Sequence, residues 1–307
     1  MHAGEETGQH LAQPRPVFPA SRMLSGAGVR EHSGWIVDIG ALLSLKSAIV
    51  LTAFAVFAVW ERVRPADPRP LLLRIGHFGR AARERLGRNA ALFVLNTLAG
   101  PLIVLPVTWW ATGAGAGLRP EWWGWPLDIL LLDLWIYWWH RANHEMPFLW
   151  RFHQVHHLDE FLDTTSAFRF HFGEVVLSAL ARALLVLLFD MPMTSVIVFE
   201  ALVLASAIFH HSDAKLAPSV ERALSMVVIT PGIHWVHHHA VRADTDSNYG
   251  TFFSFWDRLF GTRSRTERFA GMPLGVERMG ERGLMRLLSA PFDRQKRAKP
   301  APRSARQ

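Results

Sequence analysis

The chain has 307 residues, half of them hydrophobic, and a formal net charge of +7 at pH 7. This length allows one large or two modest domains, and so high an apolar content makes a membrane protein the first class to test. The basic excess accompanies no motif that reads RNA or DNA, so we expect no nucleic-acid partner. The sequence contains no cysteine. Disulfides and thiolate metal sites are therefore excluded, and any metal must be bound by His, Asp or Glu.

The first third of the chain predicts two membrane spans after a polar, proline-containing tail at residues 1–34. Two apolar runs, Trp35–Trp60 and Ala90–Trp110, are long enough to cross a bilayer. Within the first run, Lys46 is expected to reach the nearer interface or to face the bundle interior. We treat residues 35–124 as one region made of these two spans and the loop between them.

The loop from Glu61 to Asn89 is rich in arginine, at positions 62, 64, 69, 74, 80, 83, 85 and 88. Because cytoplasmic loops carry an excess of basic residues, this loop is predicted to be cytoplasmic. Tryptophans flank the glycine-rich turn Ala111–Glu121, which is typical of an aromatic belt at the opposite interface. A third apolar run, Trp125–Trp139, then returns to the cytoplasmic side and leads into His140.

A further apolar stretch, Phe172–Phe209, is broken at Asp190–Pro192 and predicts a hairpin of two short spans. Arg182 and Glu200 would lie at similar depth in this hairpin. We expect them to form an ion pair, because isolated charges at that depth are costly; the alternative is that each faces a wet cavity.

Residues 263–307 are expected to form an amphipathic segment around Leu284, Leu287 and Leu288, followed by a disordered basic tail attracted to anionic lipid headgroups. The fold class that follows is all-α. We predict an integral membrane helical bundle, with three spans plus an apolar hairpin, that carries a histidine-rich cap on the cytoplasmic side.

Twelve of the sixteen histidines lie between positions 140 and 239. His140 and His144 stand four residues apart, which places both rings on one helix face. His153, His156 and His157 lie within one helical turn, and the same spacing returns at His234, His237 and His238. This repeated spacing predicts a metal site. The isolated residues His2, His10, His32 and His77 are not expected to bind metal.

Imidazole without thiolate suits Fe, Zn, Cu or Ni rather than Mg or Ca. Eight or more candidate ligands exceed what one ion uses, so two ions are predicted. Three functional classes remain open on these grounds: a dimetal oxidoreductase, a membrane protein that stores or transports metal, and a dizinc lipid hydrolase.

Several segments together resemble one family. They are residues 133–144 (DLWIYWWHRANH), 149–157 (LWRFHQVHH), 169–174 (RFHFGE), 209–212 (FHHS), 230–238 (TPGIHWVHH), 248–250 (NYG) and 256–262 (WDRLFGT). In order and content they resemble the bacterial branch of the fatty acid hydroxylase and sterol desaturase superfamily. The resemblance covers residues 125–262, the expected catalytic domain.

The resemblance implies a membrane oxidoreductase that hydroxylates or desaturates a lipid such as a sterol, hopanoid or fatty acyl lipid. It implies two iron ions, with zinc as a possible occupant after purification, O2 as co-substrate, and a separate electron donor of the ferredoxin or cytochrome type. The location implied is the bacterial inner membrane. The ligands and catalytic residues that it implies are His140, His144, His153, His156, His157, His234, His237 and His238, with His171 and His211 as further metal ligands.

The same resemblance favours His211 over its neighbour His210. It leaves His239 as a solvent-facing residue or a neighbour of the ligands. Asp133 and Glu174 are placed to orient ligands or to serve a structural role. Arg141 and Arg169 are expected to pair with such carboxylates or with lipid headgroups.

Overall fold

The computed structural model describes residues 29–30, 36–67, 80–114 and 124–293. Over these ranges the regular elements are helices, apart from one short antiparallel pairing of β1 (Val29–Arg30) with β2 (Ile36–Val37). The prediction of an all-α fold is thereby confirmed. The predicted belt turn, apart from its first four residues, and most of both tails lie outside the described residues.

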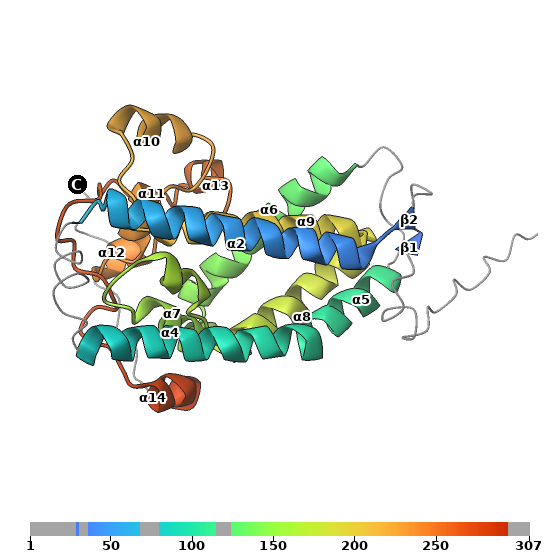
Figure 1. The fold of residues 1–307 in the computed structure, drawn as a ribbon, viewed down its shortest axis with the longest axis horizontal. Helices are drawn as coiled ribbons and strands as arrows, with labels where there is room; N and C mark the ends of the chain where they lie inside the picture. The colour runs from blue at the N-terminus through green and yellow to red at the C-terminus, as the bar shows by residue number, and fades with distance from the viewer. Residues whose placement is uncertain (1–28, 31–35, 68–79, 115–123, 294–307) are drawn as a thin grey trace, which may run out of the picture.

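Six longer helices run broadly along the long axis of the molecule (Figure 1). They are α2 (Ile39–Val63), α4 (Arg80–Ala99), α5 (Leu105–Gly113), α6 (Trp125–Glu145), α8 (Phe172–Phe189) and α9 (Met193–His211). A π-helical turn, η1 (Gly100–Val104), joins α4 to α5; Pro101 lies within it and Pro106 in the first turn of α5. Neither proline has an N–H to donate, which explains why the regular hydrogen-bond ladder is interrupted there.

Within the described residues, four helical segments are long and apolar enough to cross a membrane: Ile39–Val63, Ala82–Gly113, Phe172–Phe189 and Met193–His211. They indicate an integral membrane protein and match two of the three predicted single spans and both arms of the hairpin. The helix α6 is not among them, so the span at Trp125–Trp139 stays a prediction. Its Asp128 and Asp133 are fully buried, whereas Trp125 and Trp138 on the same helix are exposed, so one face of α6 carries polar groups into the protein.

The hairpin of α8 and α9 turns at Asp190, whose φ of 50° places it in the left-handed region. Asp is one of the residues that adopt this conformation at small cost. Arg182 donates to Glu200 Oε1 at 2.5 Å, which confirms the predicted ion pair. Lys46 of α2 pairs with the other oxygen of Glu200, so Lys46 faces the bundle interior.

The arginine-rich loop is shorter than predicted, because α2 continues to Val63 and α4 begins at Arg80. Arg85 is bound by Asp159 at 2.6 Å and Asp163 at 2.8 Å. Arg88 lies 3.4 Å from Glu281. These two arginines therefore hold neighbouring segments together. The cytoplasmic location of the loop and of the histidines stays a prediction.

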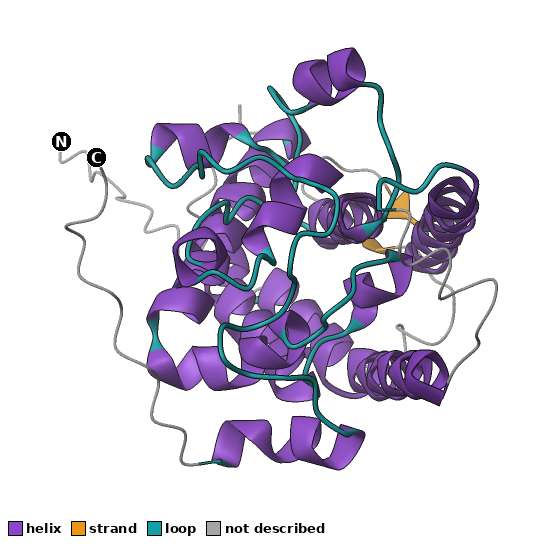
Figure 2. Cartoon of the chain, turned by 90° about the vertical axis from the view of Figure 1, so that its left-hand side faces the viewer, coloured by secondary structure: helices purple, strands orange, loops and turns teal. Residues whose placement is uncertain are grey.

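Short helices gather at one end of the bundle and form a cap over it (Figures 1 and 2). They are α7 (Pro147–His157), η2 (Thr164–Phe168), α10 (Pro218–Leu224), α11 (Pro231–His237), α12 (Arg242–Thr245), α13 (Phe255–Leu259), α14 (Leu284–Ser289) and η3 (Ala290–Phe292). The predicted amphipathic segment is α14. Its Leu287 is completely buried in a cluster with Leu92, Val155 and Leu158, which fastens the end of the described chain to the cap.

Candidate metal centre

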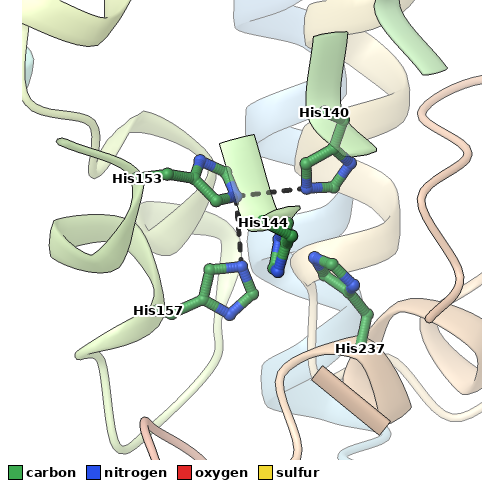
Figure 3. Close-up of side chains that lie close together, drawn as sticks. All are labelled: His140, His144, His153, His157 and His237. Carbon is green, nitrogen blue, oxygen red and sulfur yellow. Dashed lines mark hydrogen bonds between the residues drawn. The ribbon is translucent and has the colours of Figure 1, made fainter. Parts of the chain in front are cut away.

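The structure brings nine histidines together in two groups at the boundary between bundle and cap. The first group contains His140, His144, His153, His157 and His237; the second contains His156, His211, His234 and His238. Each histidine offers one ring nitrogen, and within a group these nitrogens lie within 4.8 Å of one another. Figure 3 shows the rings of the first group turned toward a common centre.

The spacing of the ring nitrogens fits ligands arranged around an ion. His153 Nε2 lies 3.2 Å from both His140 Nε2 and His157 Nε2. In the second group, Nε2 of His211 lies 3.0 Å from Nε2 of both His156 and His234. Two nitrogens about 2.1 Å from one metal lie roughly 3.0–3.4 Å apart when they subtend about 90–109°. Two ions, one in each group, therefore fit the residues present.

The outward-facing nitrogen of several rings is held by an acceptor, which fixes the orientation of the imidazole. His140 Nδ1 donates to Tyr249 O at 2.8 Å and His237 Nδ1 to Ser247 O at 2.6 Å. His211 Nδ1 donates to Ala207 O at 2.7 Å. Because Nδ1 carries the proton in these rings, Nε2 presents its lone pair to the centre, as metal-binding histidines do.

The electrostatics of the site favour neutral imidazoles. His237 Nε2 is buried in the first group and has no hydrogen-bond partner among the described residues, which an ion at the centre would explain. Burial, with the coulombic effect of neighbouring histidines, lowers the pKa of His237 to about 3. Burial and the adjacent rings also hold the pKa of His157 and His238 well below the usual range. Neutral rings are the form that binds metal.

Neighbouring histidines in the sequence serve different groups. His157 of α7 belongs to the first group and His156 to the second. In the same way, His237 belongs to the first group and His238 to the second. The rings of His157 and His238 stack with centroids 4.3 Å apart, where the two groups meet. Each of these two segments therefore contributes to both groups.

His171 is the one predicted ligand that the structure does not bring to either group. Its Nδ1 accepts from Gly173 N at 2.9 Å and caps α8, while its Nε2 donates to Leu288 O at 3.1 Å. Both ring nitrogens are thus in use away from the metal groups. Sequence spacing did not reveal this, because a cap residue at the start of α8 resembles a ligand in the pattern.

The remaining two histidines of the cluster are buried beside the groups. His210 packs against His234 with ring centroids 4.0 Å apart but is not one of the nine, which agrees with the preference for His211. His239 donates from Nδ1 to Asp244 Oδ2 at 2.8 Å. It is only 8% exposed, so the solvent-facing interpretation of His239 is wrong.

The two predicted orienting carboxylates behave differently. Glu174 Oε1 accepts from His153 Nδ1 at 2.7 Å, so Glu174 does orient a histidine of the first group. Asp133 instead accepts from Phe253 N at 3.1 Å and Trp256 Nε1 at 2.9 Å. Asp133 therefore fixes the loop around α13 and leaves the rings to other partners.

Both predicted arginines pair with carboxylates. Arg141 donates to Glu145 at 2.8 Å. Arg169 is completely buried and donates to both oxygens of Glu281, at 3.1 and 2.7 Å. The carbonyl of Arg169 lies 3.2 Å from His156 Nδ1. Arg169 thus links a residue near the C-terminal end of the described chain to the second group.

A turn that follows the last histidines was missed as part of the site. Tyr249 N and Gly250 N donate to Asp257 at 2.7 and 2.9 Å, which holds the Tyr249 carbonyl beneath His140. Gly250 is required there, because a Cβ would lie 2.8 Å from Phe253 O. The NYG and WDRLFGT segments were visible in the sequence, but their role needed the fold.

Comparisons with known proteins agree with this geometry. The model of the fatty acid hydroxylase family matches residues 125–262. The ornithine lipid hydroxylase OlsE of Rhizobium tropici is 24% identical over 257 residues, which are 82% of this chain and 76% of the relative. The alkylglycerol monooxygenase of Danio rerio is 33% identical over 140 residues, which cover 46% of this chain and only 30% of that enzyme.

A cholesterol 25-hydroxylase-like protein of Danio rerio is 31% identical over 172 residues, 53% of this chain and 65% of the relative. No solved structure matches the chain. The named relatives are lipid hydroxylases and monooxygenases, and the matched residues hold nine of the ten predicted ligands in two groups. Residues 125–262 therefore match the fatty acid hydroxylase family, and the named relatives support this assignment.

Proposed function

We propose that the protein is an O2-dependent dimetal oxidoreductase that hydroxylates a membrane lipid, with iron as the metal in both groups. The observation that carries the proposal is the convergence of nine buried histidines into two adjacent sets of ring nitrogens. Imidazole ligands suit iron, and bound iron supplies the means to activate O2 for attack on an unactivated C–H bond.

The protein itself orients the histidine rings and keeps water away from them. None of the nine histidines is more than 9% exposed. Glu174 and the carbonyls of Tyr249 and Ser247 fix the rings in place, so little reorganisation is needed when metal binds. A site so enclosed excludes water from the reacting carbon and limits loss of oxidising power to solvent.

A lipid substrate is supported by the four apolar helices and by the named relatives. Hydroxylation is preferred to desaturation because the relatives are named hydroxylases and monooxygenases. We further propose a separate electron-donor protein that docks on the cap and a cytoplasmic location for the cap. The position of the histidines at the end of the bundle argues against a metal transporter. A dizinc lipid hydrolase is the second candidate, and metal analysis of the purified protein distinguishes it from an iron oxidoreductase.

Lipid profiling of cells with and without the protein tests the proposal. We expect a lipid that is one oxygen atom heavier in cells that express the chain, and its loss in His156→Ala. The matched control is His171→Asn, which keeps an acceptor at the start of α8 and should retain the product. Two irons per chain in the purified protein support the proposal. Tightly held zinc with hydrolysed lipid and no oxygenated product would refute it.

A further inference from the structure

An apolar groove lies along α8, and no role has so far been assigned to it. The groove has a volume of about 470 Å³ and lies between α5, α6 and α8. Its lining includes Val107, Trp110, Trp139, Leu177, Ala181 and Leu184. Most of these residues belong to the candidate spans Ala82–Gly113 and Phe172–Phe189, so the groove lies on the part of the molecule that is apolar enough to face lipid hydrocarbon.

Two helices lead from this groove to the first group of histidines. On α6, Trp139 lines the groove and the next residue is His140. On α8, Leu184, Ala181 and Leu177 follow the helical spacing of one face, and Glu174 is the next residue on that face. Glu174 holds His153 at 2.7 Å. Both walls of the groove therefore belong to helices that carry a residue of the first group, or its partner Glu174, a short way beyond the lining.

The chemistry of the lining restricts what can occupy the groove. Apart from the indole N–H groups of Trp110 and Trp139, the lining side chains carry no polar atom. A headgroup would have no partners there, whereas an alkyl chain loses nothing by entering. The distance from Leu187 to Glu174 is about 20 Å along the helix, which is enough to seat a long stretch of hydrocarbon.

A second groove, between α2 and α9, provides a contrast. It has a volume of about 120 Å³ and is lined by Lys46, which pairs with Glu200. Its smaller volume and the charge in its wall make it unsuitable for an alkyl chain. The larger groove is therefore the one that we assign to the substrate.

We propose that the groove between α5, α6 and α8 binds the alkyl chain of the lipid substrate and directs it to the first histidine group. This inference rests on the proposed lipid hydroxylation. The small side chain of Ala181, placed between leucines, keeps the groove open. The width of the groove at Ala181 and its length toward Leu187 then determine the thickness and length of the alkyl chain that reaches the first group.

The test is photo-crosslinking of the full-length protein in phospholipid nanodiscs with a phospholipid that carries a diazirine in its acyl chain. We expect labelled peptides from α5, α6 and α8, and at least a tenfold loss of labelling at α8 in Ala181→Phe. The matched control is Ala205→Phe, which fills the smaller groove. In this variant we expect the same labelling of α8 as in the wild-type protein. Leu184→Trp, at a position 67% exposed, gives the same block without repacking the interior.

The results separate this inference from the proposed function. Reduced labelling together with at least a tenfold loss of lipid product in Ala181→Phe or Leu184→Trp, with metal content and melting temperature kept, supports the groove. Equal labelling along all spans, or unchanged labelling and turnover in both variants, overturns it even if the protein hydroxylates lipid. Groove labelling in a protein that yields no oxygenated lipid would refute the proposed function and leave the groove as an alkyl-chain site.

Discussion

The partner of the outward-facing nitrogen decides what each histidine can do. Glu174 and the carbonyls of Tyr249 and Ser247 accept from three rings of the first group and leave Nε2 facing the centre. His171 has the same side chain, but Gly173 and Leu288 occupy both of its nitrogens. Residue type therefore predicted which histidines are candidate ligands. The hydrogen-bond partners of each ring distinguish the nine histidines of the two groups from His171, which caps a helix.

Glu174→Gln tests the orienting role of the carboxylate at His153. The amide is a weaker acceptor, so we expect a 10- to 100-fold loss of metal affinity in the first group. Competition with a metal chelator, followed by metal analysis, measures the loss. Glu145→Gln is the control, because Glu145 is exposed and pairs with Arg141 away from the histidine groups. Equal metal affinity in wild type and Glu174→Gln would show that Glu174 only fills space.

Acid should destabilise the metal-free protein. In the unfolded chain a histidine takes up a proton near pH 6.5, whereas burial lowers the pKa of folded His237 to about 3 and those of His157 and His238 far below 6.5. The unfolded state therefore binds more protons below pH 6.5, and stability falls as the pH drops through this range. Thermal melting should be flat above about pH 7.5 and decline below 6.5. A melting temperature that rises between pH 7 and 5 would contradict this.

At the scale of helices, apolar length predicted most of the bundle. The hairpin and the first two spans were recognisable because their runs are long and apolar. The span predicted at α6 stays a prediction, because its tryptophans and leucines stand beside Asp128 and Asp133, whose buried partners lie far away in the sequence. Ser195 donates to Asp128, and Phe253 and Trp256 donate to Asp133. Such contacts between distant segments cannot be read from local pattern.

Exchange of charges tests the ion cluster that joins three helices. Arg182→Glu or Glu200→Arg alone should destabilise the bundle, because each leaves like charges at membrane depth. The structure predicts that the double variant recovers only in part, since Lys46 also contacts Glu200. Adding Lys46→Glu should restore most of the remainder. Thermal melting in detergent measures the series. Full recovery in the double variant would show that Lys46 contributes nothing.

For the whole molecule, the site depends on segments that begin at residue 140 and end at residue 257. The sequence predicted nine of the ligands, but beyond His140 and His144 on one helix face it did not predict which of them share a centre. That division depends on how α6, α7, α9 and α11 meet, with Asp257 and Arg169 fixing the backbone behind them. The sidedness of the cap stays a prediction from the arginine pattern.

The alternation of His156 with His157, and of His237 with His238, couples the two centres through the backbone. An ion in one group restricts the motion that α7 and α11 retain without metal, so part of the small entropy cost for the second ion is already met. Loading should therefore be cooperative, and His157→Ala should weaken the second group although its four histidines are intact. Native mass spectrometry during iron titration should show mainly empty and doubly loaded chains. A large population with one ion at half saturation would indicate independent centres.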